Sequence, residues 1–162
     1  MTLRLAKISL VLGVALLYFF VVINNLTDYD SNYQFIRHVL MMDSTPGNSG
    51  MWRAINQPVL HTAFYLTIIL WEALTMILCG WGALRLFRSI RDSRETFRAA
   101  SNVAVGGLSI GLMMWLVAFL GVGGEWFSMW QSKSWNGQEA AFRMFTVVGI
   151  VLLVVLARDS EV

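Results

Sequence analysis

Glu72 is the residue of this sequence best placed to do chemistry, because its carboxyl group lies near the middle of a long apolar run, Val59 to Leu84. An ionised carboxylate at the centre of a membrane helix costs about 2.5–3.5 kcal/mol on insertion scales. The group must therefore be neutral, paired, or exposed to a polar cavity. It could bind a proton or a cation, or it could be a neutral acid hydrogen-bonded to a neighbouring helix, and the sequence leaves both open.

His61 and Tyr65 precede Glu72 on the same predicted helix and should share its face. His61 lies eleven residues before Glu72, and eleven steps of about 100° return to within about 20° of the same direction. The three side chains predict an inward polar stripe that descends from one membrane surface. The full set of candidate pocket residues is His61, Tyr65, Glu72, Glu125, Glu139 and Arg143.

Glu139 and Arg143 lie one helical turn apart at the start of the last apolar run, in the order that favours an ion pair. We expect their charges to neutralise each other. At 1.5 Å per residue, Arg143 would lie about 6–8 Å below the start of its helix, within reach of Glu125, Asp28 or Asp30. The pair either anchors a cap to the helices or closes the top of the Glu72 stripe.

Aromatic residues are concentrated between the last two apolar runs. Trp126, Trp130 and Trp135 fit the aromatic belt of a membrane interface, which we favour over a stacking platform for a sugar or a quinone. Asn136 is positioned to cap the last helix. The candidate interface or cap residues are Asp28, Trp126, Trp130, Trp135 and Asn136.

Metal and cofactor chemistry have little support in the sequence. His38 and His61 are the only two histidines and follow no ligand spacing, so we assign no metal ligand and leave the cofactor unknown. Cys79 is the only cysteine, which excludes an internal disulfide. A membrane enzyme using Glu125 or Glu139 as a general base would need a substrate cleft, and the sequence favours a non-enzymatic role.

The elements that must position these residues follow from composition. The 162-residue chain is 57% hydrophobic and 14% charged, too apolar for a soluble globule of this size. We predict a single-domain, all-α membrane protein with four transmembrane helices in an antiparallel bundle, since membrane strands would be shorter and would alternate in polarity. The predicted spans are about 6–25, 58–85, 102–123 and 138–158, with external loops 26–57 and 124–137 forming a cap, and a cytoplasmic link 86–101.

Basic residues predict the orientation. One side would hold Arg4, Lys7, Arg85, Arg88, Arg91, Arg94, Arg98 and Arg158, and the other only Arg37, Arg53 and Lys133. Both termini should therefore face the cytoplasm. This bias accounts for the net charge of +2, so no nucleic-acid partner is expected.

Two local features concern packing. The first external loop should fold against the helices, with short helices at 33–42 and 51–55. Gly107 and Gly111, four residues apart in the third apolar run, favour close approach of another helix.

Several segments resemble one family of proteins. They are Asn24–Asn32, His38–Asp43, Met51–Ile55, Gly123–Gln131 and Trp135–Arg143, and together they are similar to the bacterial DUF2165 family of predicted small integral membrane proteins. The likeness covers nearly the whole chain. It implies a four-span protein of the bacterial inner membrane with unknown function and no catalytic residues to transfer.

Two functions remain in view. The sequence favours a non-enzymatic interaction or accessory subunit, whose external cap docks a membrane-protein partner or a second copy of the chain, because aromatic and charged residues suit such an interface. The alternative is a small transporter or a ligand- or cation-binding membrane protein, with Glu72 in an outward-facing polar pocket. Under either function, the protein is embedded in the lipid bilayer.

Overall fold

The structure, a computed structural model, describes residues 1–47 and 51–157. Helices account for all regular secondary structure in these residues, and no strand occurs among them. The elements in chain order are α1 Thr2–Thr27, α2 Tyr29–Met41, α3 Pro58–Arg88, α4 Arg94–Ala100, α5 Asn102–Met113, η1 Met114–Trp126, η2 Met129–Gln131 and α6 Gln138–Leu156.

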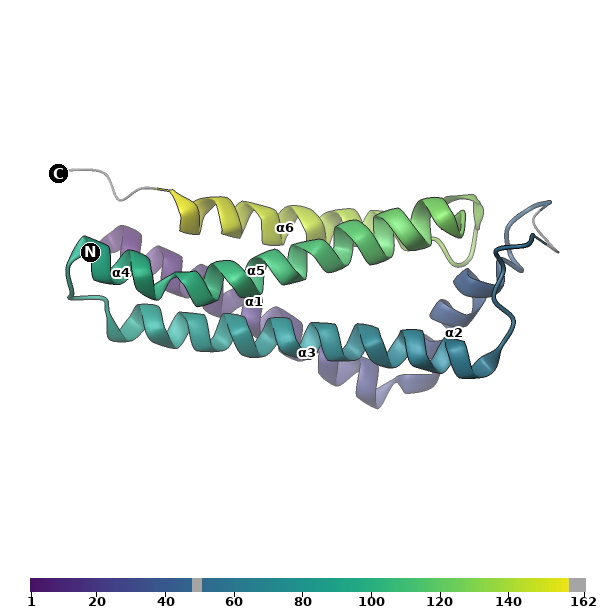
Figure 1. Ribbon diagram of the computed structural model, residues 1–162, viewed down its shortest axis with the longest axis horizontal. Helices are drawn as coiled ribbons and strands as arrows, with labels where there is room; N and C mark the ends of the chain where they lie inside the picture. Colours follow the sequence, from purple (N-terminus) through teal and green to yellow (C-terminus); the bar gives the residue numbers. More distant parts are fainter. Residues whose placement is uncertain (48–50, 158–162) are drawn as a thin grey trace.

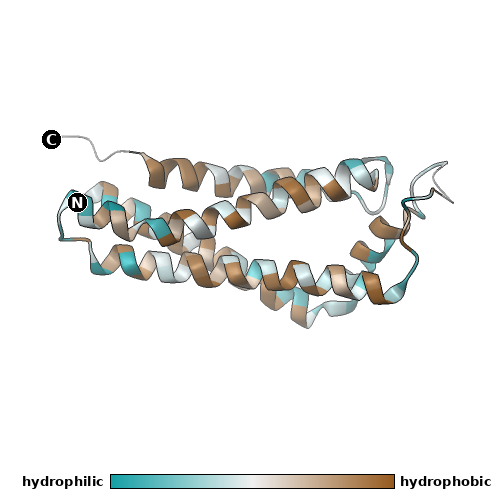
Figure 2. Cartoon of the chain, viewed as in Figure 1, coloured by the Kyte–Doolittle hydropathy of each residue, from teal (hydrophilic) through white to brown (hydrophobic). Residues whose placement is uncertain are grey.

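Four helical segments are long and apolar enough to cross a membrane. They are α1, α3, the segment Arg94–Trp126 that joins α4, α5 and η1, and α6. All four run along the long axis of the molecule (Figure 1). Hydrophobic residues cover them along their length, while polar residues gather in the turns at either end (Figure 2). The all-α class and the four candidate spans are thus confirmed.

The helices differ from the predicted spans mainly at their ends. Helix α1 begins at Thr2 and continues to Thr27, and α3 continues to Arg88, because amphipathic end residues add helical turns beyond the hydrocarbon core. Helix α6 ends at Leu156. The predicted end of that span at residue 158, and Arg158 with it, lie outside the described residues.

Helices α3 and α5 approach each other closely, with glycines at the contact points. A Cβ added at Gly107 would lie 2.9 Å from the backbone nitrogen of Cys79, and one added at Gly82 would lie 2.6 Å from the Cα of Ala104. At Gly111 a Cβ would lie 2.7 Å from the hydroxyl of Tyr18 on α1. The two glycines singled out in the sequence therefore let α5 approach α3 and α1 closely.

The end of the molecule that holds the N-terminus is tied together by basic side chains. Nη1 of Arg4 donates to the backbone oxygens of Ile90 (2.9 Å) and Asp92 (2.7 Å) in the α3–α4 turn. Nζ of Lys7, which is buried, donates to the backbone oxygen of Ala157 (2.6 Å). These contacts hold the start of α1 against the ends of α3 and α6.

At the opposite end, α2 folds back onto the long helices (Figure 1). It begins at Tyr29 rather than near residue 33, and its rings at Tyr29 and Tyr33 lie 4.8 Å and 6.1 Å from the ring of Tyr65 on α3. The predicted helix at 51–55 is wrong. That segment is a turn followed by irregular chain, because the amide of Ile55 bonds to the backbone oxygen of Leu40 (2.9 Å) instead of continuing a helix.

The two loops at this end share a small apolar cluster, which we call the cap cluster: Val39, Leu40, Met42, Phe127 and Met129. Polar contacts reinforce it. Nη2 of Arg53 donates to Oγ of Ser128 (2.8 Å), and the hydroxyls of Ser44 and Ser132 lie 2.8 Å apart. The first loop and the connection before α6 therefore pack as one unit.

The second half of the third span is a π-helix, η1, over 13 residues. The wider turn is visible in the bond from the amide of Phe127 to the oxygen of Val122 (2.9 Å), five residues back. Such helices are rare, are mostly a single turn long, and are frequent at functional sites. This π-helix was not predicted from the sequence.

Candidate functional site

Glu72 lies in the interior, with its side chain 2% exposed. Its Oε2 accepts a hydrogen bond of 2.6 Å from Nδ2 of Asn25 on α1. Tyr65 lies seven residues before Glu72 on α3. Its hydroxyl donates to the backbone oxygen of the same Asn25 (2.8 Å). Asn25 therefore connects Tyr65 and Glu72 across the α1–α3 contact.

A second polar pair lies deeper in the bundle. Nε1 of Trp115, the second residue of η1, donates to the hydroxyl of Tyr18 on α1 (2.8 Å), and both side chains are buried. Because Tyr18 packs against Gly111, any larger residue at position 111 would displace it. This pair fixes the start of η1 against α1.

A cavity of about 430 Å³ lies beside these groups. Glu72, Asn25, Tyr65 and Trp115 line it, and it is bounded by residues of α1, α2, α3, η1 and α6. Its volume is within the range of about 300–1,000 Å³ that is usual for small-molecule pockets. We call it the polar cavity.

The chemistry of the polar cavity is that of one carboxyl group among aromatic rings. Among the described residues, Oε2 of Glu72 accepts the bond from Asn25 and no partner is recorded for Oε1. The walls carry the rings of Phe20, Phe35, Tyr65, Trp115 and Phe119. No Lys, Arg or His is among the described residues that line it, so no protein cation is available there to pair with Glu72.

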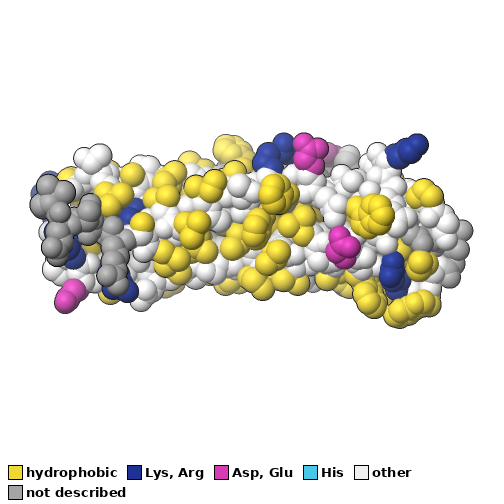
Figure 3. Space-filling view, turned by 90° about the horizontal axis from the view of Figure 1, so that it is seen from above, with side chains coloured by type: hydrophobic (Ala, Val, Ile, Leu, Met, Phe, Trp, Pro, Cys, Tyr) yellow, Lys and Arg dark blue, Asp and Glu magenta, His cyan; other side chains and the backbone are white. Residues whose placement is uncertain are grey.

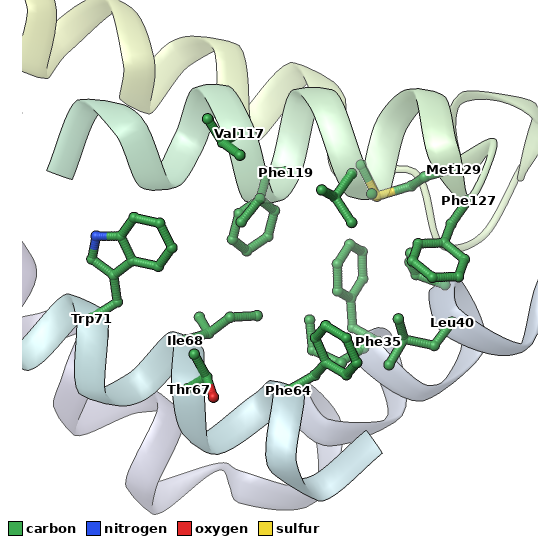
Figure 4. A pocket seen from close by; sticks show the side chains of 15 residues that line it. Phe35, Leu40, Phe64, Thr67, Ile68, Trp71, Val117, Phe119, Phe127 and Met129 are labelled. Carbon is green, nitrogen blue, oxygen red and sulfur yellow. The ribbon is translucent and has the colours of Figure 1, made fainter. Parts of the chain in front are cut away.

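A second cavity, of about 240 Å³, lies between η1, α3 and α2. We call it the apolar pocket. Figure 4 shows Phe119 of η1 and Ile68 of α3 pointing toward one another across it, with Trp71 at one side and Phe35 at the other. Its only side-chain polar groups are already bonded, since the hydroxyl of Thr67 donates to Ala63 (2.8 Å) and Nε1 of Trp71 donates to Ile110 (3.0 Å).

His61 is buried, like Tyr65 and Glu72, but lies apart from them. Its Nε2 bonds to the backbone oxygen of Ile55 (2.9 Å), and its Nδ1 is buried with no hydrogen-bond partner among the described residues. It does not line the polar cavity. The predicted stripe is therefore divided: Tyr65 and Glu72 share a site, and His61 holds the segment before α3.

Glu125, Glu139 and Arg143 are all exposed, and none lines the polar cavity or the apolar pocket. The expected ion pair between Glu139 and Arg143 is not formed within 4.0 Å in the described part of the chain. Both side chains lie at the surface of α6.

On the face seen in Figure 3, charged side chains gather at the left end and in the right half, with hydrophobic ones along the whole length.

The candidate cap residues are spread around the cap cluster. The ring of Trp135 stacks on His38, with centroids 4.6 Å apart, while Trp126 and Trp130 are 47% and 53% exposed. Oδ1 of Asn136 accepts from the amide of Gln138 (3.1 Å), the first residue of α6, but the N-cap position is Gly137, so the prediction that Asn136 caps this helix is wrong. Asp28 is exposed at the junction of α1 and α2, and its backbone oxygen accepts from Nδ2 of Asn32 (2.9 Å).

Sequence reasoning missed Asn25, Tyr18 and Trp115 as members of the site. The available signal was weak, because a Tyr inside one apolar run and a Trp inside another are ordinary in membrane helices. Asn25 lies at the end of its run, where polar residues are expected. Only the pairing of α1 with α3 and η1 shows that these three face Glu72 or its neighbours.

No group of three or more His, Cys, Asp or Glu within residues 1–47 and 51–157 is arranged to hold a metal ion.

Comparison with protein families finds a match over residues 3–158 to the model described as a predicted small integral membrane protein (DUF2165). No curated protein and no solved structure gives a significant match.

Proposed function

Since the chain belongs to the DUF2165 family of predicted small integral membrane proteins, we propose that it binds an organic cation within the membrane, with Glu72 as the anchoring carboxylate. An ionisable residue inside a membrane helix suggests a functional site, because it is costly to retain. A bound ammonium group would supply the positive charge that no described lining residue provides.

The observation that carries this proposal is Oε1 of Glu72, which has no recorded partner and belongs to a side chain that lines an aromatic cavity. Aromatic faces attract ammonium groups, with about 0.5–2 kcal/mol for each desolvated contact. A carboxylate together with such rings is a recognised way to bind an amine. The same site would serve a small transporter if the cavity opened in turn to each side of the membrane.

Binding of n-butylamine to the purified protein in lipid nanodiscs tests the proposal. Glu72→Gln keeps the shape and the bond from Asn25 but removes the charge, so we expect affinity to fall by about tenfold or more, as when a buried charge pair loses one member. Glu125→Gln is the matched control, because this carboxylate is exposed and lies outside the cavity. If Glu72→Gln and Glu72→Leu both bind butylamine like the wild type, Glu72 is structural and the proposal fails.

Docking through the cap is the second candidate. Trp52, Trp126 and Trp130 are 82%, 47% and 53% exposed, and the guanidinium of Arg53 lies 5.7 Å from the ring of Trp126. Exposed Trp beside Arg is a composition found at protein interfaces, and we propose a second copy of the chain as the partner. Native mass spectrometry should then show a dimer that Trp52→Ala weakens. A monomer at all concentrations would exclude it.

We also propose that the protein lies in the bacterial inner membrane with both termini in the cytoplasm and the cap outside. The distribution of basic residues supports this orientation, since cytoplasmic loops carry the excess of Lys and Arg.

A further inference from the structure

We infer that the organic cation is the head group of a single-chain amphiphile, a long-chain alkylamine, whose hydrocarbon chain occupies the apolar pocket. This inference rests on the proposed function, because it takes the amine at Glu72 as given. It adds the class of ligand and assigns a role to a second cavity.

The two cavities are neighbours. Four side chains line both of them: Phe35, Ile36, Ile68 and Phe119. A molecule with its head in the polar cavity therefore has to pass only this apolar wall to reach the second cavity. Phe119, which lines both cavities and projects from η1 toward Ile68 (Figure 4), is one of the side chains whose rotation would join them.

The apolar pocket suits a hydrocarbon chain and little else. The hydroxyl of Thr67 and the indole N–H of Trp71 are both used in bonds to the backbone, so a polar group placed there would lose its hydrogen bonds to water without replacement. The volume of about 240 Å³ is below the range of about 300–1,000 Å³ typical of whole ligands. It therefore fits part of a ligand that is anchored elsewhere.

The charge of the site selects among amphiphiles. Glu72 is the only Asp or Glu in the polar cavity, and no Lys, Arg or His lines either cavity among the described residues. A fatty acid or an anionic phospholipid would bring a negative group next to this carboxyl without a cation to compensate. An amine brings the opposite charge, so the head group should be cationic.

The bilayer is the natural source of such a molecule. Phe64, Val117 and Val122 line the apolar pocket and are 40%, 41% and 38% exposed. These residues lie in membrane-length helices, so their exposed sides face lipid. A membrane-dissolved amphiphile would reach the pocket without crossing water.

Binding of three probes to the protein in nanodiscs of neutral lipid tests the inference, with empty nanodiscs measuring simple partition. The probes are n-butylamine, n-dodecylamine and dodecanoate. Ala118→Phe fills the apolar pocket from η1, and Thr67→Leu fills it from α3 if the larger change disturbs folding. Leu116→Phe is the matched control, because Leu116 is 43% exposed on the same helix and lines neither cavity.

We expect Ala118→Phe and Thr67→Leu to weaken dodecylamine by about tenfold, since a filled pocket cannot accept the chain without strain, and to leave butylamine within about twofold. Leu116→Phe should change neither, and dodecanoate should not bind above partition. If the filling variants bind dodecylamine like the wild type while Glu72→Gln still weakens butylamine binding as expected, the hydrocarbon chain lies elsewhere and only this inference fails. If dodecanoate binds as tightly as dodecylamine, the choice of a cationic head group is wrong.

Discussion

The hydrogen bond from Asn25 to Glu72 should contribute measurably to the free energy of unfolding. Replacing Asn25 by Leu leaves the buried carboxyl without its partner among the described residues, which should lower the free energy of unfolding by about 1–3 kcal/mol. Replacing both residues by Leu removes the unsatisfied group as well, so the double variant should be more stable than Asn25→Leu alone. Thermal unfolding in detergent measures this cycle. A neutral Asn25→Leu, or a double variant less stable than both single ones, would contradict the assignment.

For single residues, the sequence shows which side chains are energetically costly to bury better than it shows which residues contact them. Glu72 could be singled out because a carboxyl within an apolar run is expensive wherever the helix packs. Its partner could not, since Asn25 faces Glu72 only through the pairing of α1 with α3. The Glu139–Arg143 pair fits helical spacing, yet the exposed side chains remain apart; spacing permits such a pair, and exposed pairs contribute too little to enforce it.

At the scale of elements, the α3–α5 contact depends on glycine at the points of closest approach. Gly107→Ala would place a Cβ 2.9 Å from the backbone nitrogen of Cys79, so the helices must move apart, and we expect a loss of about 1–3 kcal/mol. Gly106→Ala is the control on the next residue, because nothing lies within 4 Å of a Cβ there, and it should change stability by less than about 0.5 kcal/mol. Equal effects of the two substitutions would show that α5 does not pack on α3 through this face.

The positions of the helices were easier to predict than their type, α or π. The apolar runs and the periodicity at 33–42 predict helices that the structure contains, because length and spacing alone decide them. They do not distinguish the π-helix of η1 from an α-helix, since the apolar pattern of Met114–Trp126 suits both. The segment 51–55 shows the reverse error, in which local periodicity yields to a backbone bond between Ile55 and Leu40.

For the whole molecule, orientation is the property to test. Cys79 is fully buried, so after its replacement by Ala a single new cysteine can report one site. Ser134→Cys lies before α6 and Glu95→Cys lies in α4, both exposed. In intact bacterial spheroplasts a membrane-impermeant maleimide should label Ser134→Cys, and Glu95→Cys only after lysis, because the cytoplasmic side carries the excess of basic residues. The opposite pattern would invert the proposed topology.

Composition sufficed for the class of protein, and much less for its site. A chain that is 57% hydrophobic has to place helices in a bilayer, whatever its detailed packing. The cavities could not be predicted, because the polar cavity draws residues from five elements. Only Tyr65 and Glu72 of the six pocket candidates line it. His61 is on the same helix, but its ring bonds to Ile55 before α3 instead.

Each cavity also contains an indole of its own. Trp71 lines the apolar pocket and Trp115 lines the polar cavity, and both N–H groups are held by hydrogen bonds. The chain has 7 Trp, and the others line neither cavity. In a variant that keeps only one of these two Trp, its fluorescence would report on one cavity. Trp115 would report the arrival of a head group, and Trp71 the arrival of the hydrocarbon chain.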